Sequence, residues 1–278
     1  MRLLAQALAA VLLASCQISG GQGDPGPAVL LATTTSFQDS GLLDVLKADF
    51  EKRTGYRLRP TAVGTGAALA IGARGDADVL FVHAPEEERA FMAAGNGERR
   101  LLVMHNDFVI VGPPSDPAKV RAVDALSAFR AIAASGSAFV SRGDNSGTNI
   151  YELGLWKRAG VEPAGAWYVR AAVGMGQTLQ VASEKRAYTL TDRATYLARR
   201  EALELDILVQ RDPPLLNPYH VITVAPKKFP RVNAAGAKVF AEYLVSAEAQ
   251  RLIGAFGVDT YGERLFTPDA GKNEEDLR

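Results

Sequence analysis

Cysteine is almost absent from this 278-residue sequence, in which Cys16 is the single example. One cysteine excludes an intramolecular disulfide and argues against a metal cluster held by thiolates. Histidine is also scarce: His83, His105 and His220 are the only three, and they lack the paired spacing of a metal-binding motif. We therefore expect no metal site and no cofactor, and we interpret the histidines as packing or hinge residues.

The sequence has no excess of either charge, because its 31 lysines and arginines balance 31 aspartates and glutamates. This balance argues against nucleic acid as a partner. Catalytic motifs are missing as well: Ser146 lies in no Gly-x-Ser-x-Gly turn, and Gly64-Thr65-Gly66 lacks the lysine of a P-loop. An anion-processing hydrolase is thus an alternative without a credible nucleophile and base, and we expect a binding protein that is not an enzyme.

No apolar run reaches the roughly 20 residues of a transmembrane helix. The run Leu3–Leu13 follows Met1 and Arg2 and is typical of a cleaved export signal, which we assign to residues 1–15. Its ending, Leu-Ala-Ser-Cys, resembles a bacterial lipobox and predicts lipidation of Cys16. The lipidated cysteine and the Gly- and Pro-rich stretch after it, residues 16–28, form a flexible tether. We expect a periplasmic or cell-surface protein anchored to the membrane through Cys16.

Strands and helices alternate along the rest of the chain, which predicts an α/β fold with mostly parallel sheets flanked by helices. The apolar run Val79–Val82, for example, is typical of a strand buried in a parallel sheet. A further strand is predicted at Asp107–Val111, and helices are predicted at Ala234–Leu244 and Ala247–Ala255. Roughly 250 residues exceed the usual size of a single core, so we expect two lobes. Lobe 1 is predicted at 29–106 with 222–270, lobe 2 at 107–221, and a polar tail at 271–278.

Four loops rich in hydroxyl groups or glycine lie between a predicted strand and a predicted helix. They are Thr33–Ser36, Gly64–Gly66, Arg142–Thr148 and Gly174–Gly176. Helix starts carry unpaired N–H groups and partial positive charge, and Arg142 adds a permanent charge. Ligands of open α/β sheets bind at the carboxyl ends of strands, where all four loops fall. Routine helix capping explains each loop separately, but together they favour an anion-binding cleft.

Several segments, in this order and spacing, resemble the tungstate-binding lipoproteins of bacterial ABC transporters, which belong to the type II periplasmic binding proteins. The matching segments are Ala32–Ser36, Val79–Glu86, Asn106–Pro113, Ser141–Thr148, Gly174–Leu179, Ala187–Arg193 and Asn217–Tyr219. The resemblance implies two lobes that are joined by crossover strands and close on an oxyanion. It implies tungstate, and also molybdate, as ligand and an ABC permease as partner. We expect a monomer, which suits lobe closure.

The same resemblance implies the ligand-binding residues, with Arg142 as the charged anchor. Hydroxyl or backbone donors are implied at Thr34, Thr35, Thr65, Gly66, Ser146, Gly147 and Thr148, the backbone around Met175 and Gly176 in the opposite lobe, and the phenol of Tyr188. Tungstate is fully deprotonated at neutral pH and only accepts hydrogen bonds, so donors suit it and a facing carboxylate does not.

Asp144 leaves phosphate as the alternative ligand. The stretch Arg142–Thr148 also resembles the anion loop of periplasmic phosphate-binding proteins, in which the aspartate accepts the remaining phosphate proton. An Asp144 that points into the cleft would repel a proton-free dianion and favour a protonated one. An Asp144 that pairs with Arg142 or caps the helix would only orient the arginine.

Overall fold

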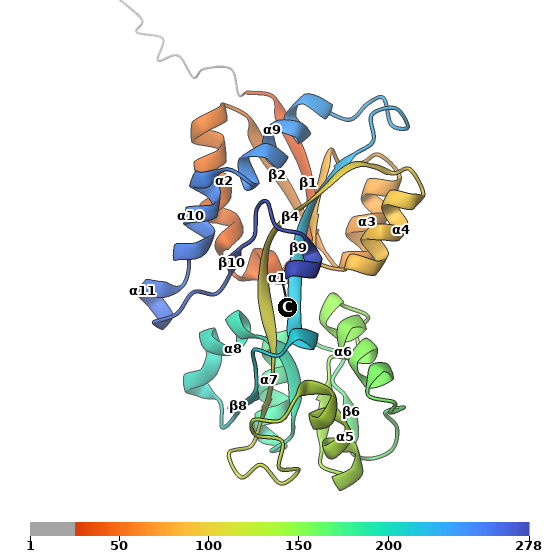
Figure 1. Cartoon of the computed structure of the whole chain (residues 1–278), viewed down its shortest axis with the longest axis vertical. Helices are drawn as coiled ribbons and strands as arrows, with labels where there is room; N and C mark the ends of the chain where they lie inside the picture. The colour runs from red at the N-terminus through yellow and green to blue at the C-terminus, as the bar shows by residue number, and fades with distance from the viewer. Residues whose placement is uncertain (1–25, 278) are drawn as a thin grey trace, which may run out of the picture.

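The computed structural model describes residues 26–277. Figure 1 shows two lobes stacked along the long axis of the molecule and connected by two long strands, β4 and β9. Strands β4 (Gly97–Gly112) and β9 (Leu216–Val224) pair in antiparallel orientation, from Gly97 opposite Val224 to Asp107 opposite Leu216. They form the crossover on which both lobes are built.

The upper lobe in Figure 1, lobe 1, contains a mixed sheet in the order β10-β4-β9-β3-β1-β2. Its parallel part consists of β1 (Ala28–Thr34) between β2 (Arg57–Val63) and β3 (Val79–Val82). The four residues of β3 are all buried, as expected of an apolar strand inside a sheet that is covered on both faces. β10 (Thr267–Pro268) forms the edge beside β4.

Helices cover both faces of this sheet and create two separate cores. One face is covered by α2 (Leu42–Thr54), α9 (Ala234–Leu244) and α10 (Ala247–Ala255), whose apolar residues pack around Phe50. The other face is covered by α3 (Thr65–Ala73) and α4 (Pro85–Ala93). Two short helices complete the lobe, α1 (Thr35–Asp39) and α11 (Val258–Tyr261).

The lower lobe, lobe 2, surrounds the far end of β4. There β7 (Thr189–Asp192) and β8 (Asp206–Val209) pair with β4, while β5 (Phe139–Ser141) and β6 (Tyr168–Arg170) form a parallel pair. Its helices are α5 (Ala125–Ser135), α6 (Gly147–Arg158), α7 (Met175–Glu184) and α8 (Arg193–Arg199). The core of the lobe centres on Trp156, whose ring lies edge-on to Phe129 and Phe139 at centroid distances of 4.3 and 5.1 Å.

The α/β architecture predicted from the sequence is confirmed, with two differences in the crossover. β4 begins ten residues before the predicted strand at 107, because the charged stretch from Glu98 to Arg100 hides its strand pattern. β9 joins the lobe 1 sheet already at His220, which pairs with Val82 of β3, so the chain enters lobe 1 before the predicted limit at 222.

The predicted tail from residue 271 folds back onto lobe 1. Its short 3-10 helix, Glu274–Asp276, places the Glu274 carboxylate 3.0 Å from the guanidinium of Arg100. Within the described residues, no helix has the length and apolar character needed to cross a membrane. The predicted export signal and the lipidation at Cys16 lie outside these residues.

Candidate anion-binding site

The four donor-bearing loops open four helices that face one another across the gap between the lobes. α1 and α3 begin at the lower edge of lobe 1, whereas α6 and α7 begin in lobe 2 (Figure 1). A cavity of about 640 Å³ lies between the lobes on the side of α1. It is lined by residues of both lobes, among them Thr35, Ser36, Arg142, Gly174, Met175 and Gly176.

On the other side of the cleft, α3 and α6 approach each other closely. A Cβ atom added to Gly147 would lie 2.9 Å from Thr65 Oγ1 and 3.3 Å from Cε1 of His83. Thr65 and Gly147, which the sequence assigns to one site, are therefore neighbours across the cleft. Only a residue without a side chain fits at position 147 in this closed arrangement.

The loop between β5 and α6 is shaped by two residues in the left-handed region, Gly143 (φ 63°) and Asn145 (φ 57°). At Gly143 a side chain would also collide with Arg170, because its Cβ would lie 2.8 Å from the Arg170 Cβ. After these turns, the Ser146 hydroxyl caps α6 by accepting a hydrogen bond from the Asn149 N–H at 3.3 Å. The first N–H groups of α6 are left without intrahelical partners, as at any helix start.

Asp144 is held within its own loop. One carboxylate oxygen accepts a hydrogen bond from the Ser146 N–H at 3.1 Å, and the other accepts one from Nη2 of Arg142. Partial burial alone would raise the pKa of Asp144, but the hydrogen bonds from Ser146 and Arg142 together lower it. The aspartate is therefore ionised and orients the arginine, which is the arrangement expected for a proton-free ligand.

Two polar atoms at the cleft are buried without a hydrogen-bond partner among residues 26–277: Nε of Arg142 and Oγ1 of Thr65. Leaving a buried polar group unsatisfied costs about 1–3 kcal/mol, and more for a charged one. In addition, the N-cap residues of α3 and α7 are Gly64 and Gly174, which provide no side-chain cap. The cleft thus contains unused donors from both lobes, which is what an acceptor-only ligand requires.

A buried carboxylate, that of Glu152, holds the residues on either side of the loop between β5 and α6. Glu152 of α6 accepts hydrogen bonds from Ser141 (2.7 Å), Trp156 (3.0 Å) and Tyr168 (2.7 Å). Burial raises the pKa of Glu152, although these hydrogen bonds oppose the rise. The Asn149 amide donates to Ser141 Oγ at 3.1 Å and so joins this network to the helix start. Nothing in the sequence pattern singles out Glu152, because its partners come from three separate elements.

His83 connects the lobe 1 side of the cleft to the crossover strands. Its Nε2 lies 3.3 Å from the Ser36 hydroxyl, and its Nδ1 lies 2.9 Å from Oδ1 of Asn217 on β9. Burial lowers the pKa of His83, which keeps the imidazole neutral at neutral pH. Two residues before Ser36, the Thr34 hydroxyl caps α1 by accepting a hydrogen bond from the Phe37 N–H at 3.3 Å. His83 is buried and packs against Tyr219, in agreement with the predicted packing role, and Ser36 joins the residues that line the cleft.

Tyr188 does not lie at the cleft. Its hydroxyl donates to Asp116 at 2.8 Å and accepts from the Ala118 N–H at 2.9 Å, and its ring packs against Gly112 at the far end of β4. The predicted role of its phenol is therefore wrong. Met175 and Gly176 do line the cleft, but α7 belongs to the same lobe as Arg142 and not to the opposite one. From lobe 1, the cavity that Arg142 lines is bounded by residues of α1 and by Ser40, Tyr261 and Leu265.

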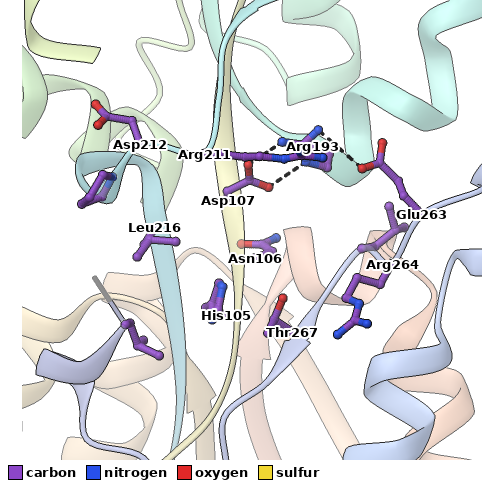
Figure 2. Close-up of a pocket in the computed structure, with 13 residues that line it drawn as sticks. His105, Asn106, Asp107, Arg193, Arg211, Asp212, Leu216, Glu263, Arg264 and Thr267 are labelled. Carbon is purple, nitrogen blue, oxygen red and sulfur yellow. Dashed lines mark hydrogen bonds and ion pairs between the residues drawn. The ribbon is translucent and has the colours of Figure 1, made fainter. Parts of the chain in front are cut away.

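A second cavity, of about 300 Å³, lies beside the crossover strands and contains an ion pair between the lobes. Figure 2 shows Arg193 of α8 directed toward Asp107 on β4 and Glu263 in the segment before β10. The guanidinium donates to both carboxylate oxygens of Asp107, at 2.8 and 2.6 Å, and lies 3.8 Å from Glu263. Arg193 therefore ties lobe 2 to the crossover and, through Glu263, to lobe 1.

Comparison with known proteins agrees with this geometry. Residues 21–248 match the family described as a PBP superfamily domain. The chain is 44% identical to the tungstate-binding protein TupA of Peptoclostridium acidaminophilum, over 98% of this chain and all of that protein. It is 39% identical to TupA of Campylobacter jejuni, over 84% of this chain and 88% of the relative.

This chain belongs to the TupA family. Among solved structures, TupA from Desulfovibrio alaskensis matches with a TM-score of 0.80 and 45% identity, covering 88% of this chain and all of that one. The tungstate ABC transporter structure from Geobacter sulfurreducens matches with a TM-score of 0.74 and 49% identity, covering 82% and 98%. The two-lobed architecture of the TupA family is thus the architecture described here.

Proposed function

We propose that this protein captures tungstate and delivers it to an ABC importer. The observation that carries the proposal is a pair of buried polar atoms at the cleft that have no hydrogen-bond partner in the described part of the chain, Nε of Arg142 and Oγ1 of Thr65. They belong to different lobes, with Arg142 at the cavity on the side of α1 and Thr65 at a cavity of about 250 Å³ on the side of α3, so an oxyanion that reaches both would hold the lobes together. Membership of the TupA family supports tungstate as that oxyanion.

Molybdate is the second ligand in this proposal, because it has the same charge and tetrahedral shape. Phosphate is not favoured, since both oxygens of Asp144 are already used within the loop. Thermal shift with tungstate, molybdate, sulfate and phosphate tests the order of their affinities, because stabilisation grows with ligand concentration relative to Kd. Tungstate should stabilise the protein at the lowest concentration; stabilisation by phosphate at lower concentration than by tungstate would overturn the assignment.

The ligand is released unchanged in this proposal. The relatives named above are binding proteins, and the cleft described here combines donors with a neutral His83 and an Asp144 already engaged by Arg142. Tungstate recovered intact after denaturation of the loaded protein would support a carrier. Turnover of a phosphoester that disappears in Arg142→Ala would instead support the hydrolase alternative.

Location, anchoring and assembly are part of the same proposal. We place the protein outside the cytoplasm as a monomer, held at the membrane by a lipid on Cys16 after removal of residues 1–15. In this proposal lobe 1 comprises residues 29–106 and the chain from His220 onward, and lobe 2 comprises the residues between them. Detergent-phase partitioning of the expressed protein and of Cys16→Ser tests the anchor: only the unsubstituted protein should enter the detergent phase. Partitioning of both would contradict lipidation at this residue.

A further inference from the structure

A second arginine faces the cavity that contains Arg142. Arg199 lies at the end of α8 and lines the cavity of about 640 Å³ together with Arg142, Met175 and Gly176. Nothing in the sequence pattern marks it, because it lies in a basic stretch with Arg200 at the end of a helix. Its position becomes apparent only when α8 is packed against α7.

The guanidinium of Arg199 lies directly against the first turn of α7. A Cβ atom added to Gly176 would overlap the Arg199 guanidinium, with Nη2 of Arg199 2.6 Å away. Gly176 therefore permits the close approach of Arg199 to the start of the helix. Positive charge at a helix N-terminus is unfavourable by itself, since the helix dipole is positive there as well. A guanidinium in this position becomes favourable when an anion lies nearby.

Within residues 26–277, Arg199 has no carboxylate within ion-pair distance. Arg142 in the same cavity is paired with Asp144, and the one acidic residue that lines the cavity is Asp39 on α1. Arg142 and Asp144 together carry no net charge. Arg199 is the second arginine that lines this cavity, and it adds a positive charge that is opposed there only by Asp39.

We propose that Arg199 makes the site selective for oxyanions with two negative charges over those with one. This inference rests on the proposed function and deepens it. Coulomb energy is proportional to the product of the charges, so an arginine at a fixed distance contributes twice as much to binding a dianion as to binding a monoanion of the same shape. Tungstate and perrhenate form such a pair, since both are tetrahedral and they differ in charge.

The test compares Arg199→Gln with Arg200→Gln, a neighbouring arginine that is exposed like Arg199 but does not line the cavity. Calorimetry measures the affinity of each of the two variants for tungstate and for perrhenate, which gives four changes relative to the unsubstituted protein. If Arg199→Gln lowers the affinity for tungstate about ten-fold, it should lower the affinity for perrhenate only about three-fold, which is the square root of that change. Arg200→Gln should leave the affinities for both ions nearly unchanged. Gly176→Ala displaces the guanidinium without removing its charge. Like Arg199→Gln, it should lower the ratio of the affinity for tungstate to the affinity for perrhenate.

Equal losses for the two anions would overturn the inference, because they would indicate a steric role for Arg199. Affinities unchanged in Arg199→Gln would overturn it as well. Each of these outcomes leaves the proposed function intact, provided that the unsubstituted protein binds tungstate. Failure of the unsubstituted protein to bind tungstate would remove both the proposed function and the inference.

Discussion

At the scale of single residues, Arg142 has two tasks that use different parts of its guanidinium. Its Nη2 donates to Asp144, while its Nε is buried and has no hydrogen-bond partner between residues 26 and 277. Truncating one partner of a buried, charged hydrogen bond costs about 2–5 kcal/mol, which corresponds to roughly 30-fold to several thousand-fold in affinity. We expect a loss of tungstate affinity in this range for Arg142→Ala, measured by calorimetry.

The matched control is Arg130→Ala, which removes an exposed arginine of α5 whose guanidinium donates to the Ser127 hydroxyl at 3.0 Å and which does not line the cleft cavity. This variant should bind tungstate as the unsubstituted protein does. Near-normal affinity of Arg142→Ala would contradict the role of Arg142 as the charged anchor.

The charge state of the Asp144 carboxylate leads to a prediction of how tungstate binding depends on pH. Its pKa is lowered from an ordinary value of 3.8, so the carboxylate is ionised above that pH, and its contribution is lost only as the pH falls through the lowered pKa. Titration of Asp144 therefore does not affect binding between about pH 6 and about pH 8. Tungstate affinity measured across this range in one buffer system should be flat. An affinity that rises steadily as the pH falls would indicate that a protonated ligand is bound against Asp144.

At the scale of the elements, closure depends on how tightly α3 and α6 approach each other. Gly147→Ala places a Cβ 2.9 Å from Thr65 Oγ1 in the closed arrangement. Overpacking of this kind costs about 1–3 kcal/mol, and here the cost falls on the closed state, in which the two helices touch. We expect tungstate affinity, measured by calorimetry, to fall about ten-fold or more.

Gly154→Ala provides the control on the same helix, because a Cβ at Gly154 meets no atom within 4 Å. It should leave affinity unchanged and raise thermal stability slightly, since alanine has the higher helix propensity. Equal affinities of the two variants would show that α6 does not approach α3 in the ligand-bound protein.

Sequence patterns predicted the elements better than the contacts between them. The helices at 234–244 and 247–255 and the strand at 79–82 have the predicted bounds, because their apolar periodicity is uninterrupted. The ten residues added to β4 were missed because charged residues mask that periodicity. Tyr188 was misplaced because a sequence shows that a tyrosine follows a helix, but not which side of the lobe its ring faces.

The same reason explains why Ser36, Glu152 and Arg199 were not predicted as site residues. Each depends on a side-chain contact between two different elements: Ser36 with His83, Glu152 with Ser141, and Arg199 with Gly176. Helix starts are local features, so Arg142, Thr65 and Gly147 could be proposed from the sequence. Their proximity depends on the crossover formed by β4 and β9.

At the scale of the whole molecule, the two lobes are joined by the crossover strands and by the ion pairs of Arg193, shown in Figure 2. The chain as a whole has no net charge, so attraction of an anion must arise within the cleft. An oxyanion that bridges Arg142 of lobe 2 and Thr65 of lobe 1 would stabilise the closed state in proportion to its affinity.

The central claim is that this cleft binds a proton-free oxyanion, and calorimetric titration with tungstate in the presence of phosphate tests it most directly. We predict saturable binding of one tungstate per chain that is unaffected by a roughly thousand-fold excess of phosphate at neutral pH. Displacement of tungstate by phosphate, or binding of phosphate with higher affinity than tungstate, would contradict the account.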